Sequence, residues 1–212
     1  HVLTAKAIDN QGGTTTSASV GVIIWNTQDI GAVGVTGSAS YDSGTSTFTV
    51  TGAGAGLLTS VDSFRFAYLP MANGDCAITA RVVAHATSWS YSRAGVMIRE
   101  SLDVGSKHAS SLYMKYTPRA YFTYRVSTNG TTSAPAVTVT ALPYWVRMVR
   151  SGNSFSAYRA TDSSGQPGTW TQIGSTQTIT MTDPVYVGLM ETSGTITANR
   201  TATFDNVSIT TP

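Results

Sequence analysis

Hydrophobic and polar residues alternate in short runs along most of the chain, and Gly, Asn, Asp and Pro separate the runs. A period of two is typical of a β-strand with one buried face, and no stretch keeps a helical period. The runs predict strands near 46–51, 64–69, 75–87, 93–101, 107–116, 119–127, 144–150, 154–160, 169–173, 177–181, 185–192 and 201–210. Strands this numerous, without intervening helices, predict an all-β fold built as an antiparallel two-sheet sandwich.

Two further β-type runs lie at the start of the chain, at 2–9 and 15–24. Between them, residues 10–13 have the Asn, Gln and Gly composition of a turn that tolerates positive φ. We therefore expect an N-terminal β-hairpin, followed by a connection over 26–37. Because two strands are rarely stable alone, the hairpin is expected to pack on the main domain or on a neighbouring molecule.

The alternation also predicts which side chains share a face. Val146 and Met148 fall on one face of their strand, and Trp145 and Arg147 fall on the other. Cys76 is the only cysteine and lies in an alternating run, so we expect it to be a small core residue. The chain therefore has no internal disulfide framework.

Charged residues make up only 11% of the chain, whereas Thr, Ser, Gly, Val and Ala are abundant. This balance favours strands and turns, as in extracellular β proteins. The net charge of +2 comes from 13 basic and 11 acidic residues without a basic run, which argues against a nucleic-acid partner. No apolar segment approaches membrane-spanning length, so we expect no membrane insertion.

Four passages, AGVMIRESLDVGSKHA, PYWVRMVRSGNSFSAYRATD, VYVGLMETSG and TATFDNVSI, together resemble a concanavalin A-like (laminin-G-like) domain of large secreted bacterial proteins, over residues 29–210. The resemblance implies a jelly-roll sandwich. The opening sequence HVLTAKAIDNQGGTTTSASVGVII resembles the last two strands of a bacterial immunoglobulin-like repeat. We therefore expect a partial immunoglobulin-like hairpin at 1–25 and a sandwich at 26–212, in a secreted or cell-surface bacterial protein. His1 is expected to mark a cut within a longer precursor.

The concanavalin A-like fold group includes lectins, carbohydrate-binding modules, adhesion domains and endoglucanases, so the fold alone does not decide the function. Retaining glycosidases need two carboxylates about 5 Å apart. The only glutamates, Glu100 and Glu191, do not form the alternating acidic pattern of jelly-roll glucanases. We expect a non-catalytic module, and a polysaccharide-cleaving enzyme remains an alternative in which these two residues meet across the sheet.

Aromatic and basic residues that suit sugar binding gather between residues 89 and 125. Tyr and Trp rings stack on the apolar faces of pyranose rings, and neighbouring polar groups supply hydrogen bonds. The leading prediction is a carbohydrate-binding module whose partner is a polysaccharide or another glycan. The candidate binding residues are Trp89, Tyr91, Arg93, Tyr121, Arg125 and His108.

Other residues suggest two candidate metal sites, one for calcium and one for copper, and an alternative function. Sugar-binding jelly rolls often hold a structural calcium ion, and Asp205 is the first candidate ligand. An N-terminal His1 could also bind copper, although a strand position argues against this. The alternative function is a structural or adhesive module that self-associates by strand pairing through the N-terminal hairpin.

Overall fold

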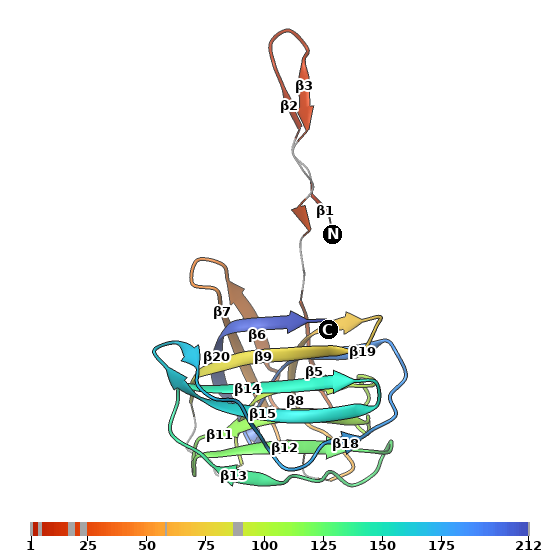
Figure 1. Ribbon diagram of the computed structural model, residues 1–212, viewed down its shortest axis with the longest axis vertical. Helices are drawn as coiled ribbons and strands as arrows, with labels where there is room; N and C mark the ends of the chain where they lie inside the picture. Colours follow the sequence, from red (N-terminus) through yellow and green to blue (C-terminus); the bar gives the residue numbers. More distant parts are fainter. Residues whose placement is uncertain are drawn as a thin grey trace.

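In the part of the chain that the structure describes, the alternating sequence forms strands and no other regular element, as Figure 1 shows. The structure, a computed structural model, describes residues 2–3, 6–16, 20–21, 25–57, 59–86 and 91–211. Within these ranges no helix is long and apolar enough to cross a membrane. The predicted all-β fold is confirmed.

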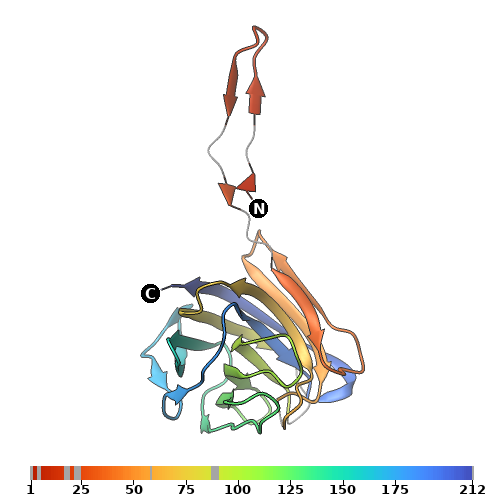
Figure 2. The ribbon, with the colours of Figure 1, turned by 90° about the vertical axis from the view of Figure 1, so that its right-hand side faces the viewer.

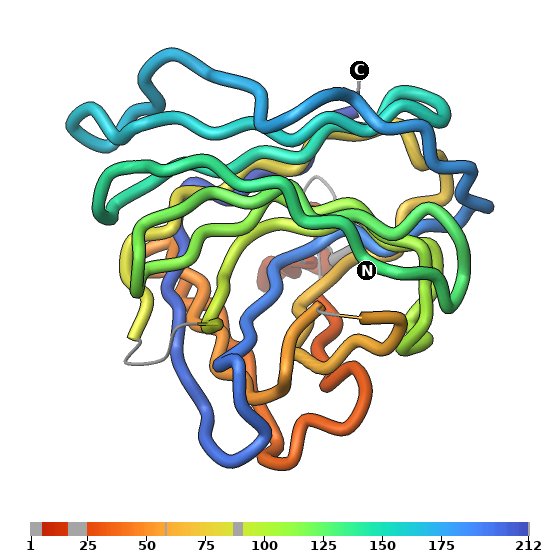
Figure 3. The backbone as a smooth tube through the Cα atoms, turned by 90° about the horizontal axis from the view of Figure 1, so that it is seen from below, coloured from red at the N-terminus to blue at the C-terminus, as the bar shows by residue number. Residues whose placement is uncertain are grey.

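From β5 onward the strands form two antiparallel sheets that lie face to face (Figures 2 and 3). The seven-stranded sheet has the order β13 (Ala136–Thr138), β12 (Arg119–Arg125), β11 (His108–Met114), β10 (Arg93–Arg99), β19 (Val185–Thr192), β8 (Phe64–Met71) and β5 (Asn26–Ile30). The nine-stranded sheet has the order β16 (Gln166–Pro167), β15 (Ser154–Ser163), β14 (Tyr144–Ser151), β9 (Cys76–His85), β20 (Thr195–Thr210), β7 (Thr47–Gly54) and β6 (Ser38–Asp42), with β17 (Thr171–Gln172) and β18 (Gln177–Thr178) also paired to β15. The antiparallel two-sheet sandwich is thus confirmed.

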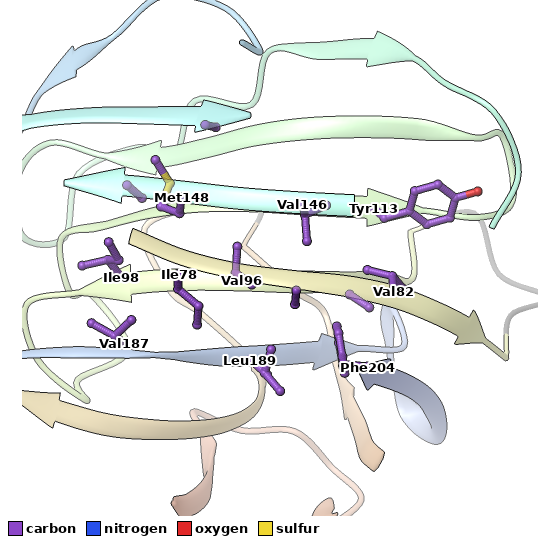
Figure 4. Packing of buried hydrophobic residues seen from close by; sticks show 14 of the residues in the cluster. Ile78, Val82, Val96, Ile98, Tyr113, Val146, Met148, Val187, Leu189 and Phe204 are labelled. Carbon is purple, nitrogen blue, oxygen red and sulfur yellow. The ribbon is translucent and has the colours of Figure 1, made fainter. Parts of the chain in front are cut away.

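The core lies between the two sheets and is filled by alternate residues of both, as Figure 4 shows. Val96 and Leu189 come from the seven-stranded sheet, and Val146 and Met148 come from the nine-stranded sheet. The alternation left open which face of β14 points inward, and the structure shows that it is the face of Val146 and Met148. Cys76 is fully buried in the same core, and burial raises the pKa of its thiol to about 11.

Part of the outer face of the seven-stranded sheet is covered by a segment that we call the covering loop, residues 55–57 and 59–63. Leu57 of this loop packs on Phe66 and Met97 from the outer face of the sheet, and all three are almost completely buried. As a result, β10 and β11 are buried at every residue. These strands therefore lie between two packed layers, the nine-stranded sheet on one face and the covering loop on the other.

A β-bulge near the end of β9 turns His85 toward the interior. Phe204 of β20 pairs with Val82, but Thr203 pairs with Ala84, so Val83 is the extra residue. The extra residue shifts the alternation by one, and the side chain of His85 therefore lies between the sheets instead of in solvent.

The N-terminal hairpin forms at the predicted place. Strand β1 (Val2–Leu3) pairs with β4 (Val20–Gly21), and β2 (Lys6–Ile8) pairs with β3 (Thr14–Thr16). Residues 6–16 are all exposed, and Figure 1 shows this part of the hairpin clear of the sandwich. The expectation that the hairpin packs on the main domain is therefore wrong for these residues, and packing on a neighbouring molecule stays a prediction.

Candidate functional site

The structure brings together three of the residues predicted to bind sugar, at the end of the sandwich where β10 begins. The guanidinium carbon of Arg93 lies 4.3 Å from the ring centre of Tyr121. Arg93 is only 7% exposed, Tyr121 is half-buried, and Tyr91 is 53% exposed. Trp89 lies outside the described residues. This end of the outer sheet face therefore presents an aromatic and basic surface.

Arg125 and His108 lie on the predicted face of the sheet but are enclosed beneath the covering loop. Both are fully buried, which does not fit the predicted contact with a glycan from solvent. Arg125 donates hydrogen bonds to both carboxylate oxygens of Asp62, at 2.6 and 3.0 Å. The two-residue alternation correctly placed Arg125 on the same face of β12 as Tyr121, but Asp62 of the covering loop covers Arg125 on that face.

Asp62 is the centre of a buried ion network under this loop. Its carboxylate also accepts a hydrogen bond from Arg99 at 3.3 Å, so one acid faces two guanidinium groups. Burial lowers the pKa of Arg99 to about 10. Burial, with Arg99 and Arg125 nearby, holds the pKa of His108 well below its ordinary value, so this imidazole is neutral. The network fixes the covering loop to the sheet.

A second buried polar group lies between the two sheets. His85 Nε2 lies 3.2 Å from Glu191 Oε1 and 2.9 Å from the hydroxyl oxygen of Ser92. A Ser-His-acid triad needs one contact on each ring nitrogen. Here both contacts use Nε2, while Nδ1 has no partner, so the three residues do not form a nucleophilic triad. Burial raises the pKa of Glu191 to about 7.

Glu100 and Glu191 do not form the carboxylate pair that the enzyme alternative requires. Glu191 is opposite Ala94, whereas Arg99, the residue before Glu100, is opposite Tyr186. Six residues of strand separate the two positions, which is roughly 20 Å. Glu100 instead forms an ion pair with Lys107 at 2.7 Å. The alternative in which the two glutamates meet across the sheet is therefore contradicted by the strand register.

The open edge of the sandwich carries a hollow that sequence reasoning missed. Strands β5 and β6 are the edge strands of the two sheets, and near them a hollow of about 460 Å³ is lined by residues of β6, β7, β8 and β20 together with Trp25, which precedes β5. A smaller hollow of about 260 Å³ adjoins it and shares Trp25, Tyr41 and Phe48. We call the larger hollow the edge groove, which is lined by Trp25, Tyr41, Ser46, Phe48, Leu69, Asn206, Val207 and Ile209.

Aromatic rings form the wall of the edge groove. The ring centre of Phe48 lies 4.8 Å from that of Trp25 and 4.6 Å from that of Tyr41. Tyr41 is 53% exposed. The polar lining residues Ser46 and Asn206 both have positive φ, at 53° and 49°. Residues other than glycine adopt this conformation at a cost, often at binding sites.

Asp205 does not fit the predicted calcium site. Its carboxylate accepts a hydrogen bond from Arg81 at 2.9 Å, so a guanidinium already occupies the position that a cation would take. The same Arg81 pairs with Asp162 on β15. Nowhere in the described ranges do three or more His, Cys, Asp or Glu side chains group as metal ligands. Through Arg81 of β9, the Asp205 carboxylate on β20 is linked to Asp162 on β15. His1 lies outside the described residues.

Comparisons with known proteins establish the fold. No family model and no curated protein sequence matches the chain. Carbohydrate binding module CBM66 from Bacillus subtilis matches with a TM-score of 0.53 and 13% identity over 86% of this chain and 94% of that one. Lectin II from Ulex europaeus matches with a TM-score of 0.52 and 13% identity over 88% and 92%.

A larger protein matches over part of its length as well. A mutant of the GH43 protein BlXynB from Bacillus licheniformis matches with a TM-score of 0.58 and 10% identity, over 98% of this chain and 46% of that protein. Identities this low establish the shared fold but no ligand or activity. The chain thus has the concanavalin A-like jelly-roll sandwich, a fold found in binding modules, lectins and enzymes.

Proposed function

We propose that this protein binds carbohydrate in the edge groove. The observation that carries the proposal is a hollow of about 460 Å³ whose wall is built from aromatic rings, with polar side chains beside them. Sugar sites combine flat aromatic surfaces for the apolar faces of pyranose rings with a few directed hydrogen-bonding groups. Tyr41 offers an exposed ring, and Ser46 and Asn206 offer polar groups.

The backbone of the groove supports the same proposal. Asn206 lies where β20 loses its regular register with β9, between Asp205 and Ser208. An irregularity of this kind redirects side chains away from strict alternation. Its positive φ, like that of Ser46, costs on the order of 1 kcal/mol. Two such residues on one hollow are consistent with a recognition role.

We further propose that the protein is a non-catalytic module that is secreted or held at the cell surface. The separation of the two glutamates supports a binding role, and so does the occurrence of the fold in a carbohydrate binding module and a lectin. A single shallow groove gives modest affinity. Attachment to an enzyme or repetition along a fibre would raise the effective concentration of such a site.

Truncation of Tyr41 tests the groove. We expect Tyr41→Ala to weaken glycan binding roughly 2- to 10-fold, because it removes one exposed ring from the wall. Affinity electrophoresis against a panel of neutral polysaccharides, followed by titration calorimetry with the best ligand, would measure the loss. Ile196→Ala is the control, since Ile196 is a large side chain that is 52% exposed and does not line the groove. Equal retardation of both variants would reject the groove.

A second candidate function, self-association through the N-terminal hairpin, is favoured by the exposure of residues 6–16. Exposed strand edges offer unpaired backbone groups to another chain. If the hairpin mediates assembly, the intact chain forms concentration-dependent oligomers in sedimentation experiments, and deletion of residues 1–21 abolishes them. This deletion keeps Trp25 and so leaves the groove wall intact. A monomer at every concentration would exclude the assembly role.

A further inference from the structure

Basic residues are segregated along this chain. The 58 positions 104–161 contain seven Lys or Arg residues and no Asp or Glu. Three of the seven pair with acids from elsewhere in the chain, through the ion pairs Lys107–Glu100, Arg125–Asp62 and Arg150–Asp183. For the other four, no acid of the described residues lies within ion-pair distance. The segment therefore keeps an excess of positive charge.

Strand register gathers part of this charge at the end of the sandwich where Arg93 lies. Ala94 pairs with Tyr113, so the next position places Arg93 beside Met114, which in turn pairs with Arg119. Two strand spacings separate Arg93 from Arg119, which is roughly 10 Å. Lys115 follows Met114 in the turn between β11 and β12 and is exposed, as is Arg119.

Arg93 is the least satisfied cation of this group. It is 93% buried, since only 7% is exposed, and its Nε has no hydrogen-bond partner. No carboxylate of the described residues lies within 4 Å of it. A buried cation without a counter-charge is costly, and its nearest compensation is the face of the Tyr121 ring. An anion from outside would supply the missing partner.

Tyrosine rings border the same surface. Tyr91 and Tyr116 are 53% and 60% exposed, and Tyr121 lies under the guanidinium of Arg93. We call this set the basic end: Tyr91, Arg93, Lys115, Tyr116, Arg119 and Tyr121. Guanidinium groups bind carboxylates through paired, charge-assisted hydrogen bonds, and tyrosine rings stack on sugars. The combination suits a sugar that carries a negative charge.

We propose that the basic end is a second glycan site, separate from the edge groove, and that it binds the uronate residues of an acidic polysaccharide. The uronate carboxylate pairs with the exposed Arg119 and meets Arg93 at the part of its side chain that solvent still reaches, 7%, whereas Arg125 and His108 have none. Lys115 adds long-range attraction. The sugar ring stacks on an exposed tyrosine. A protein with both sites would hold neutral and acidic segments of a mixed polysaccharide at once, which increases its residence on the polymer.

Removal of one exposed charge at a time tests this site on the intact chain. The probe is polygalacturonate, measured by titration calorimetry at low and high salt. We expect Arg119→Gln and Lys115→Gln each to weaken binding several-fold, and salt to weaken it further. Lys6→Gln is the control, because it removes the same charge from the exposed hairpin. It should leave the affinity unchanged.

The binding results distinguish a failure of the basic end from a failure of the edge groove. An affinity for polygalacturonate that falls equally in Lys6→Gln would show unspecific attraction by net charge and overturn the proposal. Binding of a sulfated polymer but not of polygalacturonate would overturn the uronate assignment. Retardation by neutral glycans only, with loss in Tyr41→Ala, would overturn the basic end while leaving the edge groove intact.

Discussion

Replacement of Asp62 by Asn is expected to lower the free energy of unfolding by about 3–5 kcal/mol. Asp62 is fully buried and is the acid that pairs with both Arg99 and Arg125. An asparagine side chain has nearly the same volume, so the loss would come from charge rather than from a cavity. Its amide group cannot neutralise two buried guanidiniums and presents N–H donors to other donors.

Urea denaturation followed by circular dichroism measures this loss. Asp42→Asn is the matched control, because Asp42 is exposed and accepts hydrogen bonds only from its own turn, from Gly44 N and Thr45 Oγ1. We expect this control to cost about 1 kcal/mol or less. A similar midpoint shift in both variants would mean that the buried network contributes no more than a surface turn does.

The second large effect is a pH dependence of stability that arises from Glu191. Burial raises the pKa of this carboxyl to about 7 in the folded protein, from an ordinary value of 4.5. The folded state therefore holds the proton more tightly than the unfolded state. The stabilisation is complete below pH 4.5 and is lost as the pH rises toward 7. The change is roughly 3 kcal/mol for a shift of this size.

Glu191→Gln should remove this dependence, because glutamine does not titrate and has a similar shape. As the pH is raised from 4.5 to 7, the urea concentration at the denaturation midpoint should decrease for the wild type. For the variant it should stay nearly constant. Glu100→Gln is the control, since Glu100 is partly exposed and already paired with Lys107. If the stability of Glu191→Gln changes with pH as that of the wild type does, groups other than Glu191 cause the pH dependence.

Most of the sandwich could be predicted because its strands have one buried and one exposed face. The run at 144–150 alternates as expected, and the observed β14 covers Tyr144–Ser151. By contrast, β5 at Asn26–Ile30 was expected to be a connection. Its residues are mainly polar, and only Ile30 is buried, because it is an edge strand. A strand that buries so little carries no hydrophobic period for a sequence pattern to detect.

The candidate sites show a different limit. Alternation along β12 placed Tyr121 and Arg125 on one face correctly, but it carried no information about the covering loop that hides Arg125. Asp62 and Arg125 are 63 positions apart, so their contact depends on tertiary structure. The edge groove was missed for the same reason. Trp25, Phe48 and Ile209 converge only when the edges of both sheets are in place.

The two central strands β10 and β11 are buried at every residue, because one face meets the other sheet and the opposite face meets the covering loop. Neither strand has a position where a side chain can grow or gain charge without disturbing a packed neighbour. Among relatives of this protein, we expect these strands to tolerate few substitutions and to change in concert with residues 55–63. Sequence divergence would then accumulate at exposed positions such as Tyr41 of the edge groove and Lys115 and Tyr116 of the turn after β11, where a new side chain does not disturb this packing.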